Sequence, residues 1–376
     1  MSDVEKNIGT HKPEFNGEWV KLGDLCGVCS GGTPKRSVSE YWNEGSIPWV
    51  KISDISGKFV SSTEELITEA GLKGSSAKLL APGTLLYSIF ASIGAVGILK
   101  IPAATNQAIA GLSIKTDRIE RDYLYHFLKS RESLAKSSGR GAAQNNINLT
   151  ILRGMEVPVP AIGEQKAIVE QLEIIATQIK QAETQLDQLD SLVKSQFVEM
   201  FGDPIEVIDG IALGSIALLK AGETTTSSSI SNEMHDGLYP CYGGNGLRGF
   251  TAEYTHDGSY PLIGRQGALC GNVRMAVGKF KATEHAVVVQ PSIEINRVWL
   301  FHYLRYDNLA RLATGAAQPG LSVKNLNKIP VALPPLDLQR RFADFVAKVD
   351  KLGFDVQQQI EKLETLKQSL MQEYFG

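Results

Sequence analysis

One stretch of the chain, residues 164–201, contains neither glycine nor proline and repeats apolar side chains at a regular spacing. Steps of four and three residues alternate between Ile168, Leu172, Ile175, Ile179, Ala182, Leu186, Leu189 and Val193. A period of about 3.5 residues is typical of the contact seam of a coiled coil. The stretch therefore predicts one helix, roughly 55 Å long at about 1.5 Å per residue, that needs an apolar partner along its length.

The same device occurs again in residues 337–375, and a shift of 174 positions aligns the two stretches. The second seam places apolar side chains at Phe342, Val346, Val349, Val356, Ile360 and Leu363. Because each stripe needs a partner, we expect an intramolecular antiparallel helix pair rather than two unrelated surface helices. The repeat departs at Gly353, which stands where the first seam has Ile179 and should weaken the seam locally.

The segments that precede the two helices also repeat. Residues 123–130 resemble residues 299–306, and the junctions into the helices match as well, whereas residues 47–55 and 239–250 have no counterpart in the other half. The fold class predicted is α+β, a pseudo-twofold tandem repeat of two globular mixed α/β domains separated by two long antiparallel coiled-coil helices. The expected parts are a flexible N-terminal arm (1–17), a first domain (18–162), a central spacer helix (163–202), a second domain (203–336) and a C-terminal spacer helix (337–376). Where two halves share a scaffold and differ in their loops, we expect the loops to discriminate between ligands.

The formal net charge of −3 is unevenly distributed along the sequence. Residues 18–162 carry +3, residues 203–336 are neutral, and the two helical stretches together carry −5. The globular parts therefore permit nucleic-acid binding without arguing for it. No apolar run approaches the ~18 residues of a membrane span, and the polar N-terminus lacks a signal core, so we expect a cytoplasmic protein.

Signatures of catalysis and metal binding are missing from the sequence. It has no phosphate-binding loop, no H-E-x-x-H or G-x-S-x-G motif, and no tetrad of an amino-methyltransferase. Cys26 and Cys29 form a C-x-x-C pair, but a zinc site would need a second close pair, and the following Gly-rich stretch does not suit a redox motif. The pair Glu284-His285 is more typical of a binding or structural role than of a catalytic base. We therefore expect no catalytic activity, no metal and no cofactor on this chain.

These segments resemble one family, the specificity (S) subunit of type I restriction–modification systems. Residues 19–55 are similar to the start of one class of its target recognition domains, and residues 92–112 and 141–172 to that domain's middle and its exit into the helix. Residues 239–246 resemble the start of a different class. The second junction departs from the first, with Asp337-Leu338-Gln339 in place of Gly163-Glu164-Gln165, and this leaves the helix start intact.

The resemblance implies a non-catalytic subunit of an adenine-N6 DNA methyltransferase or type I restriction endonuclease complex. Each target recognition domain would bind one half of a split site in double-stranded DNA. The helix pair would set the gap between the halves and dock two modification (methyltransferase) subunits. Those partners would use S-adenosylmethionine, and separate restriction (motor-nuclease) subunits would use ATP and Mg²⁺.

Base recognition requires side chains that donate to or accept from base edges, such as Arg or Lys for guanine and Asn or Gln for adenine. In the first domain the loop candidates are Lys35, Arg36, Lys51, Ser53, Asn106, Gln107 and Arg140. In the second they are Asn245, Arg248, Arg265, Gln266, Arg274 and His285, of which Arg265 and Gln266 are favoured because they lie in a Gly-flanked turn of the divergent middle. A solvated surface position is the competing interpretation for each of them.

Two other functions stay open at the level of the sequence. One is a coiled-coil scaffold or adaptor that binds protein but no DNA. The other is a nuclease or methyltransferase whose motifs are disguised. A gel shift with randomised duplex, with and without a methyltransferase partner, distinguishes the DNA-binding interpretation from the adaptor, and incorporation of labelled methyl groups by this chain alone would support the enzyme.

Overall fold

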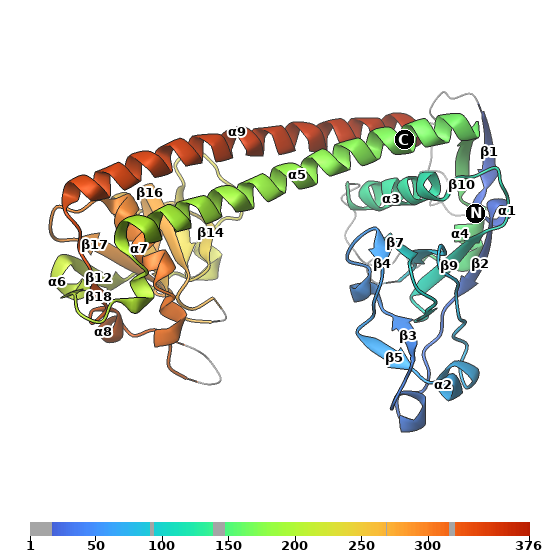
Figure 1. Cartoon of the computed structure of the whole chain (residues 1–376), viewed down its shortest axis with the longest axis horizontal. Helices are drawn as coiled ribbons and strands as arrows, with labels where there is room; N and C mark the ends of the chain where they lie inside the picture. The colour runs from blue at the N-terminus through green and yellow to red at the C-terminus, as the bar shows by residue number, and fades with distance from the viewer. Residues whose placement is uncertain (1–16, 91–93, 138–146, 268, 316–319) are drawn as a thin grey trace. The chain divides into compact units, whose positions relative to one another are not determined.

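The computed structural model describes residues 17–376 except 91–93, 138–146, 268 and 316–319, and the side chains of residues 132–137 are also outside the description. The chain divides into two compact units (Figure 1). Unit 1 contains Met1–Gln181 and Ile360–Gly376, and unit 2 contains Ala182–Gln359. Most of the predicted N-terminal arm and the candidate Arg140 therefore lie outside the described residues.

Unit 1 combines ten short strands with four helices that precede the first long helix. The strands are β1 (Gly17–Lys21), β2 (Cys26–Ser30), β3 (Ile47–Val50), β4 (Phe59–Val60), β5 (Glu65–Ile67), β6 (Leu85–Ser88), β7 (Val96–Leu99), β8 (Ala104–Thr105), β9 (Ile109–Ile114) and β10 (Glu156–Pro160). The helices are α1 (Leu22–Leu25), α2 (Glu69–Lys73), α3 (Arg121–Ser137) and α4 (Leu149–Gly154). The strands form sheets in the orders β2-β9-β6-β7-β4, β5-β3-β8 and β1-β10.

The core of unit 1 lies between its five-stranded sheet and α3. Every residue of β6 and β7 is buried, as expected for strands covered on both faces. Tyr87 of β6 pairs with Ala110 of β9 in the antiparallel ladder. Tyr123 and Phe127 of α3 are fully buried against this sheet. The chain fixes the start of α4 with Asn148, whose side-chain oxygen accepts from the Ile151 amide at 2.8 Å.

Unit 2 is built around a larger sheet. Its strands are β11 (Ile211–Ala212), β12 (Ala217–Ala221), β13 (Tyr239–Gly243), β14 (Gly246–Thr251), β15 (His256–Gly264), β16 (Val273–Ala282), β17 (Ala286–Pro291) and β18 (Pro330–Val331). Its short helices are α6 (Leu213–Ile216), α7 (Arg297–Tyr306) and α8 (Val323–Leu326). Six strands are ordered β12-β17-β15-β16-β13-β14, and β11 pairs with β18. Only the β13–β16 pairing within the six-stranded sheet is parallel among the described residues.

The two units share a scaffold but carry different sheets on it. In each, a strand pairs with the strand that leads into the long helix (β1 with β10, β11 with β18), and a one-turn helix and a further strand follow. A tyrosine of the small helix donates to a carbonyl of that exit strand: Tyr123 to Pro158 at 3.0 Å and Tyr303 to Pro330 at 2.8 Å. The five-stranded sheet of unit 1 has no equivalent in the strand order of unit 2, which is the divergence that the sequence predicts.

The two long helices, α5 (Ile162–Phe201) and α9 (Leu336–Phe375), are 40 residues each and pack against one another within each unit (Figure 1). In unit 1 the hydroxyl of Tyr374 donates to Gln171 at 2.7 Å, and in unit 2 the rings of Phe197 and Phe342 lie 5.2 Å apart. Early residues of one helix thus meet late residues of the other, which confirms antiparallel pairing within each unit. A Cβ built on Gly353 would lie 3.9 Å from side-chain atoms of Leu186 and Leu189, so the helix continues there without a close backbone approach.

The predicted seam residues face the packed side of these helices. Those that are buried are Ile168, Leu172, Ile175, Ala182, Val193, Phe342, Val346, Val349 and Ile360. Those that are half-buried are Ile179, Leu186, Leu189, Val356 and Leu363. Phe375, near the end of α9, belongs to the core of unit 1, where its ring lies 5.3 Å from that of Tyr123.

A buried glutamine fastens each long helix to its own unit. The side chain of Gln165, at the start of α5, accepts from the Glu120 amide at 2.8 Å and donates to the carbonyls of Arg118 and Pro160 at 2.9 and 2.8 Å. Gln339, at the start of α9, accepts from the Asn296 amide at 2.8 Å and donates to the Pro334 carbonyl at 2.8 Å. Both side chains tie the segment that enters the long helix to the residues just before α3 or α7.

Candidate nucleic-acid interface

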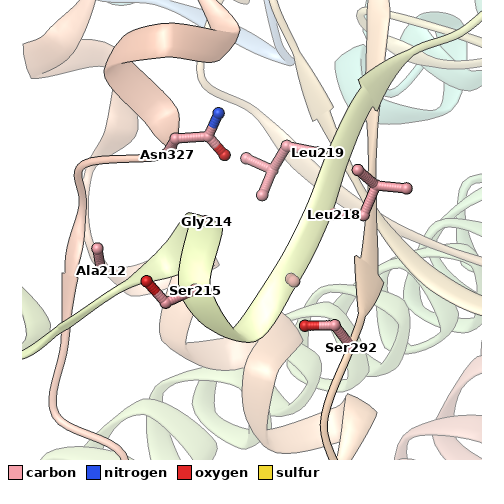
Figure 2. Close-up of a pocket in the computed structure, with 8 residues that line it drawn as sticks. Ala212, Gly214, Ser215, Leu218, Leu219, Ser292 and Asn327 are labelled. Carbon is pink, nitrogen blue, oxygen red and sulfur yellow. The ribbon is translucent and has the colours of Figure 1, made fainter.

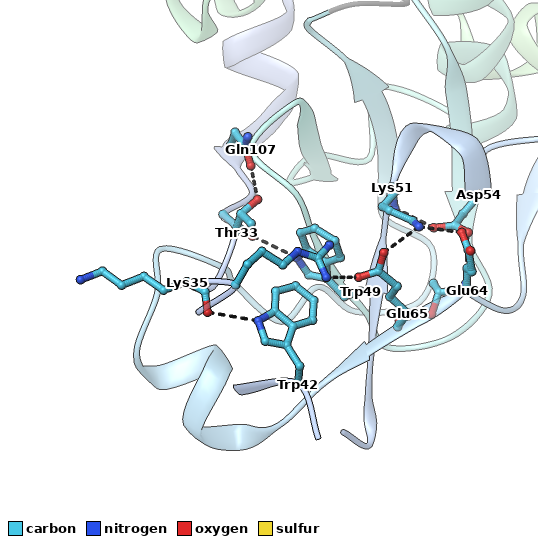
Figure 3. Close-up of polar contacts among 12 residues, drawn as sticks. Thr33, Lys35, Trp42, Trp49, Lys51, Asp54, Glu64, Glu65 and Gln107 are labelled. Carbon is cyan, nitrogen blue, oxygen red and sulfur yellow. Dashed lines mark hydrogen bonds and ion pairs between the residues drawn. The ribbon is translucent and has the colours of Figure 1, made fainter. Parts of the chain in front are cut away.

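In unit 1, two tryptophans hold the loop that carries Lys35 and Arg36 (Figure 3). The indole of Trp49, on β3, donates to the Gly32 carbonyl at 3.0 Å, and that of Trp42 donates to the Lys35 carbonyl at 3.2 Å. The two rings pack edge to face with centroids 5.1 Å apart. Because two buried or half-buried rings anchor its backbone, this loop has a defined shape rather than a free one.

Glycines allow the same loop to approach the β8–β9 connection. A Cβ on Gly31 would lie 2.2 Å from the carbonyl oxygen of Asn106, and one on Gly32 would lie 2.4 Å from the backbone of Ala77. Neither position can hold a side chain. The close approach brings Thr33 to Gln107, and its hydroxyl donates to the Gln107 side-chain oxygen (Figure 3).

Two of the candidate cations share one carboxylate. Glu65, on β5, forms ion pairs with Arg36 at 2.5 Å and with Lys51 at 2.8 Å, and Lys51 also contacts Glu64 at 2.6 Å. The guanidinium of Arg36 and then the ammonium of Lys51 hold the pKa of Glu65 below its usual range. The hydrogen bonds that Lys51 donates to Glu64 and Glu65 raise its pKa to about 12, so Lys51 is a cation at neutral pH.

The structure thus brings together Lys35, Arg36, Lys51 and Gln107 of the first domain's candidates. Lys35 and Gln107 are exposed. Asn106 uses its side-chain oxygen locally, accepting from the Ala108 amide at 3.0 Å, and Ser53 is exposed on the short turn after Lys51. Sequence reasoning missed Trp42, Trp49 and Glu65, although two tryptophans only seven residues apart are a signal of a local aromatic contact.

In unit 2, the candidates gather at one end of the six-stranded sheet. The amide of Arg265, after β15, donates to the His285 carbonyl at 3.0 Å, and the His285 ring contacts the Gln266 side-chain oxygen through Nδ1 at 2.6 Å. A Cβ on Gly244 would lie 3.1 Å from the His285 carbonyl and 3.5 Å from that of Gln266. The β13–β14 turn with Asn245 therefore packs against both of these residues.

Two more arginines border this turn. A Cβ on Gly246 would lie 3.6 Å from Cγ of Arg274, and one on Gly243 would lie 3.7 Å from Cδ of Arg248. Arg248 also donates to the Ser227 hydroxyl at 3.0 Å. Asn245, Arg248, Gln266 and Arg274 are exposed, and Arg265 and His285 are half-buried. All six candidates of the second domain thus lie around one turn.

The two buried histidines lie on the scaffold rather than in these clusters. Burial lowers the pKa of His302 to about 4, and its ring contacts the Tyr306 hydroxyl at 3.1 Å. Burial also lowers the pKa of His126, which contacts Glu173 at 3.1 Å. Both rings are neutral at pH 7 and have packed, hydrogen-bonded surroundings, which is a structural role.

One charged network on the scaffold was not found from the sequence. Lys58, in the loop before β4, forms ion pairs with Asp122 of α3 at 2.7 Å and with Glu173 of α5. Although burial opposes its charge, the hydrogen bonds that Lys58 donates to the two carboxylates raise its pKa. The network ties a loop of the divergent sheet to both scaffold helices of unit 1.

Other features offer little chemistry. A hollow where α6 meets β12 is lined by Ala212, Gly214, Ser215, Ala217, Leu218, Leu219, Ser292 and Asn327, none of which titrates near neutral pH (Figure 2). Burial raises the pKa of Cys26 to about 12 and also raises that of Cys241 and Cys270. Across the described residues, no group of three or more His, Cys, Asp or Glu side chains could hold a metal ion. Within the same residues, no helix is both long and apolar enough to cross a membrane.

Comparisons with known proteins identify the scaffold. The family model described as the type I restriction modification DNA specificity domain matches residues 16–190 and again residues 209–365. The chain is 31% identical over 355 residues to the type I restriction enzyme EcoprrI specificity subunit of Escherichia coli, covering 89% of this chain and 88% of that one. Two matches to one model confirm the predicted tandem repeat.

Solved structures with the same fold cover nearly all of the chain. A type I restriction–modification S subunit from M. genitalium superposes with a TM-score of 0.53 at 19% identity, covering 97% of this chain and 98% of that one. A chain from a study of complex assembly and conformational transition of the type I restriction–modification system gives a TM-score of 0.62 at 18% identity, covering 97% and 99%. The α+β fold with two domains and long helices is therefore confirmed. By its twice-matched domain and its full-length relative, the chain belongs to the family of type I restriction–modification DNA specificity subunits.

Proposed function

We propose that this chain is the DNA sequence-specificity subunit of a type I restriction–modification complex and that each of its two recognition domains binds one half of a bipartite site. The observation that carries the proposal is the tandem repeat with divergent sheets. One family scaffold occurs twice, yet a five-stranded sheet follows in one unit and a six-stranded sheet in the other. Two copies of one scaffold that carry different sheets suit a target made of two different half-sites.

The side chains proposed to contact DNA are those of the two clusters, together with Ser53, Asn106 and Arg140, the last of which lies outside the described residues. Arg36, Lys35, Lys51, Ser53, Asn106, Gln107 and Arg140 would serve the first half-site, and Asn245, Arg248, Arg265, Gln266, Arg274 and His285 the second. Exposed arginine, asparagine and glutamine side chains have the donors and acceptors that base edges in the major groove require. The same clusters support DNA binding over a coiled-coil adaptor, which would have no use for them.

The helix pair would fix the gap between the half-sites and dock two modification subunits along its acidic outer faces. Those partners would supply S-adenosylmethionine and methylate adenine at N6. Restriction subunits, where present, would use ATP and Mg²⁺. The chain itself would catalyse neither reaction, and it would work in the cytoplasm. Residues 18–162, 163–202, 203–336 and 337–376 are the proposed functional segments.

Exchange of one domain tests the modular part of this proposal. Residues 18–162 are replaced by another recognition domain of the family, and N6-methyladenine is mapped genome-wide in cells that also make the modification subunit. We expect one half-site to change and the other to stay the same. A new sequence at both halves would contradict independent recognition by two domains.

Lengthening both helices tests their role in setting the gap. Residues 184 and 355 are opposed, because the contacts of Phe197 with Phe342 and of Gly353 with Leu186 fix the register of the pair. Inserting one heptad at each of these positions adds roughly 10 Å, or about three base pairs at ~3.4 Å each, and keeps the seam in register. We expect a longer gap with unchanged half-sites. The matched control carries the heptad in α5 alone, which shifts the seam and should abolish methylation.

A further inference from the structure

Among the candidates that the structure describes, Arg36 alone is both stacked on aromatic rings and paired with a carboxylate. Its guanidinium carbon lies 3.7 Å from the ring centroid of Trp42 and 5.1 Å from that of Trp49, and its Nη1 lies 2.5 Å from Oε2 of Glu65. Trp49 and Glu65 are direct partners in the antiparallel β3–β5 ladder, so their side chains emerge on the same face. The site that holds Arg36, made of Trp42, Trp49 and Glu65, is therefore built partly on paired strands and not only on a loop.

The two cations that contact Glu65 differ in their exposure and in the number of N–H donors that remain available for a ligand. Lys51 contacts two carboxylates, and its side chain is 23% exposed, whereas that of Arg36 is 55% exposed. Among the described residues, Glu65 is the only acceptor that contacts the Arg36 guanidinium, so most of its N–H donors are available. Lys51 fixes the carboxylate, and Arg36 presents the donors.

The balance of charges around Arg36 argues against a role in binding only the phosphate backbone. Arg36 and Lys51 are balanced by Glu64 and Glu65, so the group attracts a phosphate backbone only weakly. An arginine stacked on a ring and paired with a carboxylate has already lost much of its rotamer freedom. Such a side chain suits a contact in which direction matters more than charge.

We propose that Arg36 recognises a guanine of the half-site bound by the first domain, and that Trp42 and Glu65 hold its guanidinium in the reading position. Guanine presents two acceptors, O6 and N7, in the major groove and matches the planar fork of arginine. Adenine presents a donor at N6 where guanine has O6, so it meets the same fork with an unfavourable donor–donor contact. The inference rests on the proposed function and adds the base and the residues that orient its reader.

The test uses the complex of this chain with its modification subunit. The site is first mapped with the unchanged protein by N6-methyladenine sequencing. Methylation rates are then measured on duplexes in which each base pair of the site is changed in turn, with R36A, R36K, E65Q and R118A variants. Arg118 is the matched control, because it is an exposed arginine of unit 1 in an ion pair with Glu18 at 2.6 Å.

We expect R36A to lose discrimination at one G·C pair of the first domain's half-site, by roughly 5- to 150-fold. R36K should lose it too, because an ammonium has no planar fork, and E65Q should weaken it less. R118A and the second half-site should keep wild-type discrimination at every position. That intact second half-site also shows that a variant is folded and assembled.

Two results would overturn the inference. One is an R36A variant whose methylation rate on each duplex equals that of the wild-type protein on the same duplex. The other is a uniform loss of binding to every sequence with a shallower salt dependence, which would make Arg36 a phosphate contact. Failure of the proposed function is a different outcome, since the unchanged complex would then methylate no bipartite site at all.

Discussion

The glutamines at the two helix junctions give the sharpest test of how the long helices are fastened. Gln165 is fully buried and Gln339 is 2% exposed, yet the first makes three hydrogen bonds to backbone groups and the second makes two. Substituting alanine removes the side-chain partner and leaves these backbone groups buried. The two substitutions should therefore have unequal costs in the free energy of unfolding.

The magnitude follows from the number of bonds. A net contribution of about 1 kcal/mol per hydrogen bond gives a loss of roughly 3 kcal/mol for Q165A and roughly 2 kcal/mol for Q339A. The difference, about 1 kcal/mol, is one hydrogen bond. Q178A, at an exposed position on α5, should stay within about 0.5 kcal/mol of the wild type and serves as the control.

Hydrogen exchange followed by mass spectrometry is the suitable assay, because it reports opening free energies for each unit separately. Q165A should reduce protection in residues 118–181 of unit 1, and Q339A should reduce it in residues 290–350 of unit 2. Equal costs, or a larger loss for Q339A, would refute the reasoning from bond number. A loss confined to the unit that does not contain the substitution would refute the fastening role.

A carboxylate at the same place adds a dependence on pH. In Q165E the new side chain would face the carbonyls of Arg118 and Pro160 with no donor unless it is protonated. The Glu120 amide can still donate one hydrogen bond to it, but burial and the two facing carbonyl oxygens raise the pKa of this carboxyl group above its unfolded value. The folded state then binds more protons than the unfolded state, so stability should fall as pH rises from 4 to 8. Wild-type protein and Q165A lack this contribution, which makes the difference between variants the quantity to follow.

Three further substitutions probe the packing and the buried charges by urea denaturation. F375A should lower the stability of unit 1 by about 3–5 kcal/mol, because a fully buried ring is removed from its core; a loss below 1 kcal/mol would show that the end of α9 is not part of that core. Wild-type protein should lose stability as the pH falls from 7 to 4, because the unfolded state protonates His302 near pH 6.5 but the folded state only near pH 4. H302N should make this loss smaller by up to about 3 kcal/mol; an unchanged pH dependence would contradict the buried neutral ring. K58M should destabilise at pH 7 by about 1–3 kcal/mol because two carboxylates lose their cation, and the difference from wild type should shrink near pH 4; a constant difference would mean that the ion pairs do not matter.

The seam could be predicted from the sequence because its information is local. A step of three or four residues along one helix fixes which side chains share a face, and the shared register of the copy at 337–375 supplied the partner. The same alignment places Gln165 over Gln339, so the fastening glutamines could have been found from the repeat. Their burial, in contrast, is visible only once the fold is known.

The candidate interface shows where sequence reasoning stops. Loop chemistry singled out Arg36 and Lys51, but their common carboxylate, Glu65, lies on another strand, and strand pairing within the divergent sheet depends on contacts distant in the sequence. In unit 2 the ladder of β15, β16 and β17 brings four of the six candidates to the β13–β14 turn. The other two, Asn245 and Arg248, belong to that turn and to β14. The sequence indicates loop positions, but it does not show that Lys51, Arg265 and His285 are half-buried or which candidates meet.

The two units differ in whether they are formed by one continuous segment of the sequence or by two. Unit 2 is one continuous segment, Ala182–Gln359, whereas unit 1 needs Ile360–Gly376 in addition to Met1–Gln181, and Phe375 sits in its core. At a synthesis rate of about 5–20 residues per second, roughly 10 to 40 s separate the two pieces of unit 1 on the ribosome. The part translated first is therefore the part completed last. During that interval the apolar face around Tyr123 and Phe127 lacks its aromatic neighbour, so in the cell the second recognition domain can finish folding before the first.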